Sequence, residues 1–162
     1  WVSDITYLPL PLNWCYLFLI TDAVSRRIVG YHVAKGLDTT GALKALNMAL
    51  VQNKDRVGLI HHSDRGIQYC SHAYVNILSK QSIKISMTQT GSPYDNAIAE
   101  RINGIIKHEL IFPHGPLTDL EHARETVTIA VNRYNNIRLH QSLNYQTPHY
   151  VHLNSQPLVV IN

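Results

Sequence analysis

The chain has 162 residues and a mass of 18.4 kDa, with 45% hydrophobic residues, 15% charged residues and a formal net charge of +3. This composition is typical of one globular domain, and it excludes a disordered chain and a histone-like polycation. The longest apolar run, from Trp14 to Ile20, has seven residues and is too short to cross a bilayer.

The first third of the chain predicts an antiparallel meander of strands. Runs rich in β-branched and aromatic residues cover Ser3–Leu8, Trp14–Thr21 and Arg27–Ala34, with short turn segments between them. The second run is almost wholly apolar, which is typical of a strand covered on both faces. Asp22 lies in the turn after this strand, where a carboxylate with a local structural role is the favoured interpretation.

Helical and strand patterns then alternate. Alanine and leucine recur at helical spacing from Thr39 to about Asn53. The elements expected next are a strand at Val57–Ile60, a helix capped by Ser71, a strand at Ile83–Met87, a loop at Thr90–Pro93 and a helix at about Tyr94–Ile111. Thr118 and Glu121 form a capping box ahead of a second long helix.

The predicted fold is α/β. Strands linked through helices need parallel neighbours, so the order βββαβαβαα favours a five-stranded mixed sheet with helices on both faces.

Three carboxylates suggest a metal-dependent site. Asp4 lies inside the first strand, where a carboxylate is costly to bury unless it is paired or binds a metal. Asp64 follows a buried strand, and Glu100 lies near the start of a helix. If the two strands are neighbours, the three groups meet at one edge of the sheet. Carboxylates suit Mg²⁺ or Mn²⁺, which support phosphodiester displacement.

A purely structural interpretation of these carboxylates stays open at this point. Asp4 could be an edge-strand charge, Asp64 a turn residue and Glu100 a solvated helix position. The helix around Glu100 favours the functional interpretation, because Lys107 lies seven residues later on the same face and could hold a phosphate. For Lys107 alone, an exposed lysine on an ordinary amphipathic helix is the favoured interpretation. Gly104 between them is unfavourable in a helix, and a close DNA backbone would explain it.

Several motifs together resemble a known family. They are Trp1-x-x-Asp4-Ile5-Thr6-Tyr7, Asp22-x-x-Ser25-Arg26-Arg27-Ile28-Val29-Gly30, His62-Ser63-Asp64-Arg65-Gly66-x-Gln68-Tyr69, Ser86-Met87, Gly91-Ser92-Pro93-Tyr94-Asp95-Asn96-Ala97, Glu100 with Lys107, and Tyr134-Asn135-x-x-Arg138-x-His140-x-x-Leu143 before Pro148. In this order they resemble the catalytic core of bacterial insertion-sequence transposases of the insertion-sequence-3 family, which is similar to retroviral integrase. The motifs span nearly the whole chain.

The resemblance implies an RNase H-like fold and a DDE triad made of Asp4, Asp64 and Glu100. It implies a polynucleotidyl transferase that uses Mg²⁺ or Mn²⁺ for DNA cleavage and strand transfer, without a covalent enzyme intermediate. The candidate phosphate contacts are Lys107, Arg101, Arg65 and Lys84.

The resemblance also sets expectations for organisation and partners. Residues 1–153 are expected to form the catalytic core and residues 154–162 a C-terminal tail. The start at Trp1 suggests a piece of a longer protein, with the family's helix-turn-helix region in the missing N-terminal part. The expected partners are element ends and target DNA, with a homo-oligomer forming on DNA. Cys15 and Cys70 cannot form a disulfide framework, which favours a reducing, cytoplasmic location, nucleoid-associated during action and without a membrane segment.

The remaining polar motif residues have more ordinary interpretations. His61 and His62 are expected to be structural more often than DNA-contacting. Asp95 and Asn96 are expected to cap the helix of Glu100. Docking of the last helix onto the core is the first interpretation for the motif residues Tyr134, Asn135, Arg138 and His140.

Two other functions compete with the transposase interpretation. The chain could be a catalytically silent DNA-binding or dimerising module of a decayed element. It could also be a purely hydrolytic RNase H-like nuclease, although the motifs outside the triad disfavour this. Strand-transfer products would separate the transposase from the nuclease, and metal-dependent nicking would separate both from the silent module.

Overall fold

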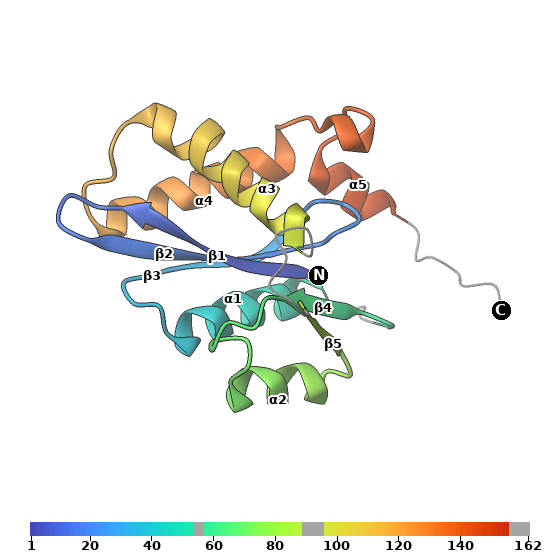
Figure 1. Ribbon diagram of the computed structural model, residues 1–162. Helices are drawn as coiled ribbons and strands as arrows, with labels where there is room; N and C mark the ends of the chain where they lie inside the picture. The colour runs from blue at the N-terminus through green and yellow to red at the C-terminus, as the bar shows by residue number, and fades with distance from the viewer. Residues whose placement is uncertain (54–56, 89–95, 156–162) are drawn as a thin grey trace.

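A computed structural model of the chain describes residues 1–53, 57–88 and 96–155 (Figure 1). Its centre is one sheet of five strands in the order β3-β2-β1-β4-β5. The strands are β1 (Val2–Pro9), β2 (Trp14–Thr21), β3 (Ile28–Ala34), β4 (Ile60–Ser63) and β5 (Lys84–Met87). β1, β2 and β3 pair antiparallel, whereas β4 pairs parallel with both β1 and β5. The predicted meander and the mixed five-stranded sheet are confirmed.

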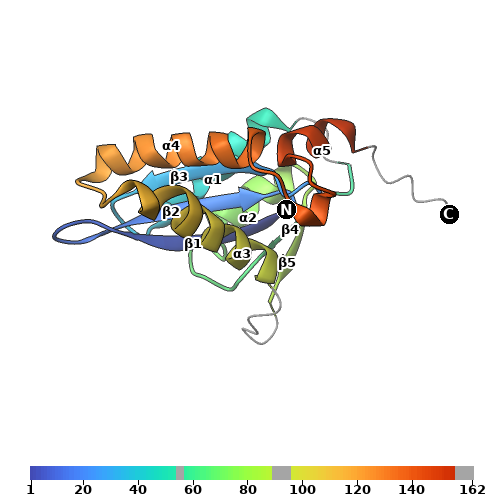
Figure 2. The same ribbon diagram turned by 90° about the horizontal axis from the view of Figure 1, so that it is seen from above.

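Helices cover both faces of this sheet. They are α1 (Thr39–Gln52), α2 (His72–Lys80), α3 (Ala97–Ile105), α4 (Leu120–Asn136) and the short α5 (Pro148–Asn154). Helices α1 and α2 lie on one face, and α3 and α4 lie over the other (Figures 1 and 2). Between α3 and α4 the chain forms a π-helix, η2 (Ile106–Ile111), and a 3₁₀ turn, η3 (Phe112–His114). A further 3₁₀ turn, η4 (Gln141–Leu143), precedes α5.

The sheet separates two hydrophobic clusters. In β2, Leu17 and Leu19 belong to the cluster beneath α3 and α4, whereas Phe18 and Ile20 pack with α1 and α2. This alternation follows from the two-residue period of a strand, and the predicted burial of β2 on both faces is confirmed. At Gly30 the sheet and α1 approach so closely that an added Cβ would lie 2.2 Å from a backbone oxygen of α1.

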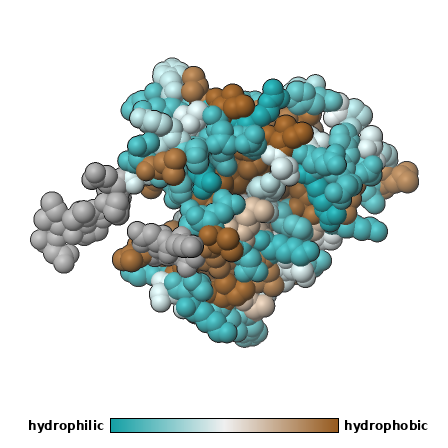
Figure 3. Space-filling view, turned by 180° about the vertical axis from the view of Figure 1, so that it is seen from behind, coloured by the Kyte–Doolittle hydropathy of each residue, from teal (hydrophilic) through white to brown (hydrophobic). Residues whose placement is uncertain are grey.

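The outer surface is mixed in polarity. On the face seen from behind, hydrophobic residues are interspersed with hydrophilic ones (Figure 3). Within the described ranges, no helix has the length and apolar character needed to span a membrane. Cys15 is buried, Cys70 is exposed, and both are free thiols.

The strand predicted at Val57–Ile60 is displaced along the chain. Val57 is 99% exposed and, with Gly58 at φ +73°, forms a turn. Strand β4 begins only at Ile60 and therefore contains both His61 and His62. The prediction was wrong because a hydrophobic residue beside a glycine was taken as the start of the strand.

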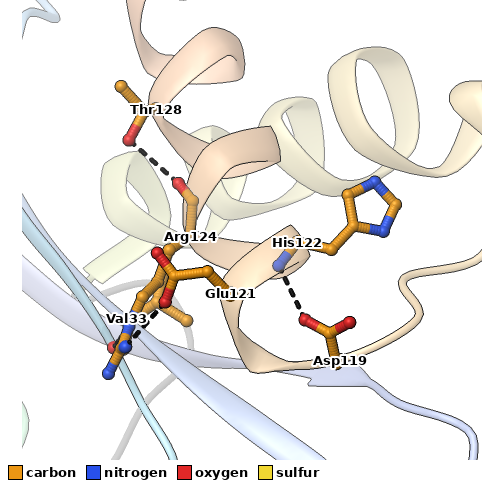
Figure 4. A network of polar contacts seen from close by, with 6 residues as sticks. All are labelled: Val33, Asp119, Glu121, His122, Arg124 and Thr128. Carbon is orange, nitrogen blue, oxygen red and sulfur yellow. Dashed lines mark hydrogen bonds and ion pairs between the residues drawn. The ribbon is translucent and has the colours of Figure 1, made fainter.

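The capping box predicted at Thr118 and Glu121 is also wrong in detail. Asp119 is the N-cap of α4, and its Oδ1 accepts a hydrogen bond from the backbone N–H of His122 at 2.9 Å (Figure 4). Thr118 instead donates its hydroxyl to Asp119, and Glu121 forms an ion pair with Arg124 at 3.1 Å. An ionised carboxylate is the stronger acceptor for the helix N-terminus.

The helix predicted over Tyr94–Ile111 is not one continuous α-helix. The α-helical part is α3, and the chain from Ile106 onward follows π-helical geometry. Asn96 is the N-cap residue of α3, but its side chain donates to the backbone oxygen of Ser3 and does not cap the helix. The loop predicted at Thr90–Pro93 lies outside the described residues, as do Tyr94 and Asp95.

Candidate active site

Strands β1 and β4 bring two of the predicted carboxylates to neighbouring positions. Val2 of β1 lies opposite His62 of β4 in the parallel register. Continuing that register by two residues places Asp4 opposite Asp64, which directly follows the last residue of β4. Because facing positions in neighbouring parallel strands share a face, both residues belong to the face covered by α3. The predicted neighbourhood of these two strands is confirmed.

Helix α3 contributes the polar groups that approach Asp4. Asn103 is buried, and its Nδ2 donates a hydrogen bond of 2.7 Å to Oδ2 of Asp4. Glu100 lies one helical turn before Asn103 and is exposed. Positions three apart on a helix are neighbours, so Glu100 and Asn103 lie on the same side of α3.

The electrostatics of Asp4 show that the three carboxylates interact. The pKa of Asp4 is raised to about 6, chiefly by burial and in smaller part by the negative charges of Asp64 and Glu100, while a hydrogen bond from the backbone N–H of Ile5 lowers it. The hydrogen bond from Asn103 opposes the rise because it stabilises the ionised form. Within the described ranges, however, no three His, Cys, Asp or Glu side chains form a cluster that could hold a metal ion as it stands.

A tight turn fixes the carboxylate of Asp64. The backbone N–H of Gly66 donates to Oδ1 of Asp64 at 2.9 Å. A Cβ at position 66 would lie 2.9 Å from the same oxygen, so a side chain there would require the Asp64 carboxylate to shift. Gly66 therefore allows the chain to fold back onto the carboxylate immediately after β4.

The two histidines of β4 make structural hydrogen bonds. His61 is buried, and its Nε2 lies 2.7 Å from the hydroxyl of Ser3 and 2.9 Å from that of Tyr74. Burial lowers the pKa of His61 to about 3, so the ring is neutral at physiological pH. His62 pairs through Nδ1 with Ser86 of the neighbouring strand at 2.9 Å. The structural interpretation of His61 is confirmed.

The four candidate phosphate contacts lie in different places. Arg101 is exposed and adjoins Glu100 in α3, and Lys107 is half-buried in η2. Arg65 is next to Asp64, but its Nε donates to the backbone oxygen of Thr88 at 2.8 Å. Lys84 lies opposite Ile60 at the start of β5, which is the end of the strand remote from Asp64. The structure therefore does not bring Lys84 to the carboxylates.

The motif near the C-terminus anchors α4 to the sheet. Asn135 accepts a hydrogen bond from the backbone N–H of Ile28 at 2.9 Å and donates to its carbonyl at 3.0 Å. Arg138 forms a two-point ion pair with Glu109 of η2. The rings of Tyr134 and His140 pack edge to face with centroids 4.8 Å apart. These contacts support the docking interpretation of the motif.

The turn at Asp22 has the local role expected for it. Oδ1 of Asp22 accepts hydrogen bonds from the backbone N–H groups of Val24 and Ser25 and from the Ser25 hydroxyl. This carboxylate therefore closes the turn between β2 and β3.

Two functional candidates were not found from the sequence. Asn103 lies three residues after Glu100 on the same side of the helix, and this spacing was a usable signal. Arg26 lies in the turn before β3 with a positive φ of 62°, and nothing local to it indicates that it approaches α3.

The sheet order and the acidic groups at adjoining strands define an RNase H-like domain. The chain belongs to the integrase core domain family, whose sequence models match residues 1–93 and 81–148. The five-stranded mixed sheet agrees with this family, and the fold expected from the motif resemblance is confirmed.

The curated relatives include proteins of insertion sequences. A Mycobacterium tuberculosis protein of element IS986/IS6110 is 38% identical over 146 residues, covering 87% of this chain and 52% of that protein. The transposase for element IS629 of Shigella sonnei is 38% identical over 148 residues, covering 91% and 49%. Transposase InsF for IS3A of Escherichia coli is 38% identical over 115 residues, covering 71% and 39%. The chain thus spans about half the length of the curated relatives it matches.

The similar solved structures are retroviral. The integrase catalytic core domain of HTLV-2 in complex with magnesium has a TM-score of 0.73 at 19% identity, covering 94% of both chains. A chain of a simian T-cell lymphotropic virus intasome has a TM-score of 0.82 at 20% identity, covering 100% of this chain and 56% of that one. At these identities the likeness establishes the shared fold.

Proposed function

We propose that this chain is the catalytic core of a DNA transposase, which cleaves DNA at the ends of a mobile element and joins them to target DNA. Asp4, Asp64 and Glu100 form its acidic triad. The observation that carries the proposal is that the register of β1 and β4 sets Asp4 opposite Asp64, beneath α3, from which Asn103 donates a hydrogen bond to Asp4. Membership of the integrase core domain family and the names of the relatives support it.

The residues present fit a divalent cation. Three carboxylates offer the oxygen ligands that Mg²⁺ and Mn²⁺ prefer, and their mutual repulsion is relieved when positive charge is bound between them. The side-chain oxygen of Asn103, buried beside Asp4, has no hydrogen-bond partner among the described residues. Asp4, Asp64 and Glu100 would hold the ion. Such an ion activates a water or hydroxyl and stabilises the leaving oxygen in phosphodiester displacement.

The residues around the triad orient its members. Asn103 holds Oδ2 of Asp4, and the Gly66 N–H holds Oδ1 of Asp64, so each carboxylate keeps another oxygen for a ligand. Arg101 and Lys107, on α3 and η2, supply positive charge for phosphates of the bound strand. These contacts position DNA without reading its sequence.

The proposed partners follow from the same assignment. The substrates are the element ends and target DNA, and the working form is an oligomer on DNA. We assign recognition of the end sequence to a helix-turn-helix region elsewhere in the full-length protein. The protein acts in the cytoplasm at the nucleoid.

The test uses the full-length protein with element-end DNA and Mg²⁺ or Mn²⁺. Asp64→Asn is expected to abolish cleavage while leaving end binding nearly intact, because the amide keeps the shape but loses the charge that holds the cation. Asp38→Asn is the matched control, since Asp38 caps α1 and asparagine caps equally well. Equal cleavage by Asp64→Asn and the parent would remove Asp64 from the site.

The products decide between the competing functions. Joined element–target strands support the transposase, whereas metal-dependent nicks without joining indicate a hydrolytic nuclease. Binding without any metal-dependent nicking indicates a silent DNA-binding module. A second readout is the melting temperature of the 162-residue chain, which Mn²⁺ should raise in the parent and not in Asp64→Asn.

A further inference from the structure

A cavity of about 530 Å³ lies beside α3, on the flank that carries Ile98, Arg101 and Ile105. Its walls come from the turn before β3, from α3, from the end of α4 and from the segment leading through η4. Among the described residues it is lined by Arg26, Ala97, Ile98, Arg101, Ile102, Ile105, Tyr134, Arg138, Leu139, His140, Gln141, Ser142 and Tyr145. Its volume is within the range of ordinary ligand sites.

Three polar atoms in these walls are buried without a partner. The Tyr134 hydroxyl, Nε2 of His140 and Nη1 of Arg26 make no hydrogen bond within the described part of the chain. Tyr134 is fully buried, and His140 is only 6% exposed. Leaving a buried polar group unpaired is unfavourable, and a ligand with acceptor atoms in the cavity would supply partners for all three.

The chemistry of these atoms indicates what that ligand is. The tyrosine hydroxyl and the arginine N–H groups are donors, and a neutral imidazole donates when its proton is on Nε2. Burial lowers the pKa of His140 to about 4, so its ring is neutral at physiological pH. Donors that converge on one cavity fit a ligand rich in acceptor oxygens.

The charges around the cavity favour an anion. Arg26, Arg101 and Arg138 line it, and Glu109 neutralises Arg138 through two hydrogen bonds of 2.8 and 3.0 Å. Neither Arg26 nor Arg101 forms an ion pair with a described residue. Guanidinium groups bind phosphate oxygens with two parallel hydrogen bonds, so two such groups suit a phosphate.

The position of the cavity favours nucleic acid as the source of that phosphate. Arg101 follows Glu100 directly in α3 but points about 100° further round the helix, so the cavity lies on the other flank of α3, one helix width from the triad. Ile98, Ile102 and the exposed ring of Tyr145 give the cavity apolar walls. A nucleotide presents a phosphate to cations and a flat base to aromatic and apolar groups.

We propose that this cavity binds a phosphate of a DNA strand on the flank of α3 away from the acidic triad, with Arg26, Arg101 and the Tyr134 hydroxyl as its donors. The inference rests on the proposed function, because it takes DNA as the substrate. It gives the C-terminal motif a role beyond docking α4, since Tyr134, Arg138 and His140 all line the cavity.

The test measures binding by the 162-residue chain without divalent metal. The main probe is a fluorescent single-stranded octanucleotide. Inorganic phosphate is the competitor, with chloride at equal ionic strength as its salt control. Polyglutamate tests an acidic polypeptide as the alternative ligand. Tyr134→Phe removes only the unpartnered hydroxyl and should leave the melting temperature unchanged or slightly higher. Tyr31→Phe, which removes a hydroxyl bonded to Thr128, is the matched control. The control for Arg101→Gln is Arg124→Gln, because Arg124 lies on α4 and does not line the cavity.

We expect Tyr134→Phe and Arg101→Gln each to weaken octanucleotide binding roughly five- to tenfold, as loss of a hydrogen bond to a charged group predicts. Neither control should do so, and phosphate should compete in the parent more strongly than in Tyr134→Phe. Unchanged binding in both cavity variants, or no measurable binding by the parent, overturns the inference. If Tyr134→Phe weakened the binding of polyglutamate but not that of the octanucleotide, the assignment of the cavity to DNA would be overturned.

These outcomes are separate from the test of the proposed function. The binding measurements need neither metal nor strand cleavage, so a silent chain can still have the phosphate site. A full-length protein that cleaves DNA would equally retain its proposed function if Tyr134→Phe bound the octanucleotide like the parent.

Discussion

Asp4 is a residue whose ionisation works against the fold. It occupies a strand interior, its pKa is raised to about 6, and burial is the largest cause of that rise. At neutral pH the folded chain therefore keeps a carboxylate charged where a neutral group would be more stable. Such a cost is typical of sites in which the charge serves binding or catalysis.

Replacing Asp4 by asparagine should therefore change how stability depends on pH. The folded-state pKa lies above the unfolded value, so the parent's free energy of unfolding should fall as pH rises from about 4 to about 6. Asp4→Asn lacks this titration and can still accept the hydrogen bond from Asn103. At pH 7 we expect the variant to be more stable than the parent by about 2 kcal/mol, with little difference near pH 3.5.

Urea unfolding at a series of pH values measures this difference. Asp38→Asn is the control, because it removes a carboxylate from an exposed helix cap. Parallel pH profiles for the parent and Asp4→Asn would show that Asp4 titrates normally.

The docking of α4 depends on one amide side chain. Asn135 satisfies both the N–H and the carbonyl of Ile28 at the beginning of β3. Asn135→Ala would leave these two backbone groups unpaired in a buried place, and should lower the free energy of unfolding by about 2–4 kcal/mol. Asn136→Ala is the neighbouring control, because Asn136 is exposed and bonds only within its own helix. A loss of equal size in both variants, measured by urea unfolding, would contradict this role.

Gly104 offers a separate test of how DNA approaches α3. A Cβ built at this position meets no atom within 4 Å outside the local helix. Gly104→Ala should therefore stabilise the chain by up to about 1 kcal/mol through helix propensity. If a DNA backbone passes close to this surface, the same methyl group should weaken DNA binding. Thermal melting and DNA titration of one variant check both effects, and unchanged DNA affinity would place the DNA elsewhere.

Local patterns predicted those elements whose signals were themselves local. The run Trp14–Thr21 matches β2 because both faces of that strand are apolar. The start of β4 could not be found in this way. Its histidines look unsuited to a buried strand until His61 is seen to bond Ser3 and Tyr74, which are distant along the chain. The π-helix after Ile105 likewise has no simple sequence signal.

In the candidate site, too, some features could be predicted from the sequence and others depend on the assembled fold. Neighbourhood of Asp4 and Asp64 could be predicted, because the strand order follows from how strands and helices alternate. The role of Asn103 depends on which side of α3 faces the sheet. The cavity proposed to bind a phosphate is lined by Arg26, Arg101 and Tyr134, which come from three parts of the sequence. Only the assembled fold brings these residues together.

Across the whole molecule, the charge predicts weak and nonspecific DNA binding by this chain. Its net charge is only +3, and its candidate contacts are cations that bind phosphates. Affinity for duplex DNA should therefore fall steeply with salt and be similar for element-end and scrambled sequences. Lys107→Ala should weaken both alike, because a lysine on a phosphate reads no base.

A salt titration with both duplexes of equal length measures this behaviour. Lys84→Ala is a useful comparison, since Lys84 lies at the end of β5 remote from Asp64. Tight, salt-insensitive preference for the end sequence would show that this domain itself carries recognition.

The sheet lies between the two hydrophobic clusters, and substitutions in one cluster should therefore affect stability independently of substitutions in the other. Leu46 of α1 and Val127 of α4 are both fully buried, but they belong to different clusters and share no cluster members. Substitutions at sites without common partners have nearly additive effects on stability. The two layers can therefore diverge almost independently, provided that the sheet between them keeps its geometry. Compensation for damage in the α3–α4 layer, which holds the proposed DNA contacts, must then arise within that layer.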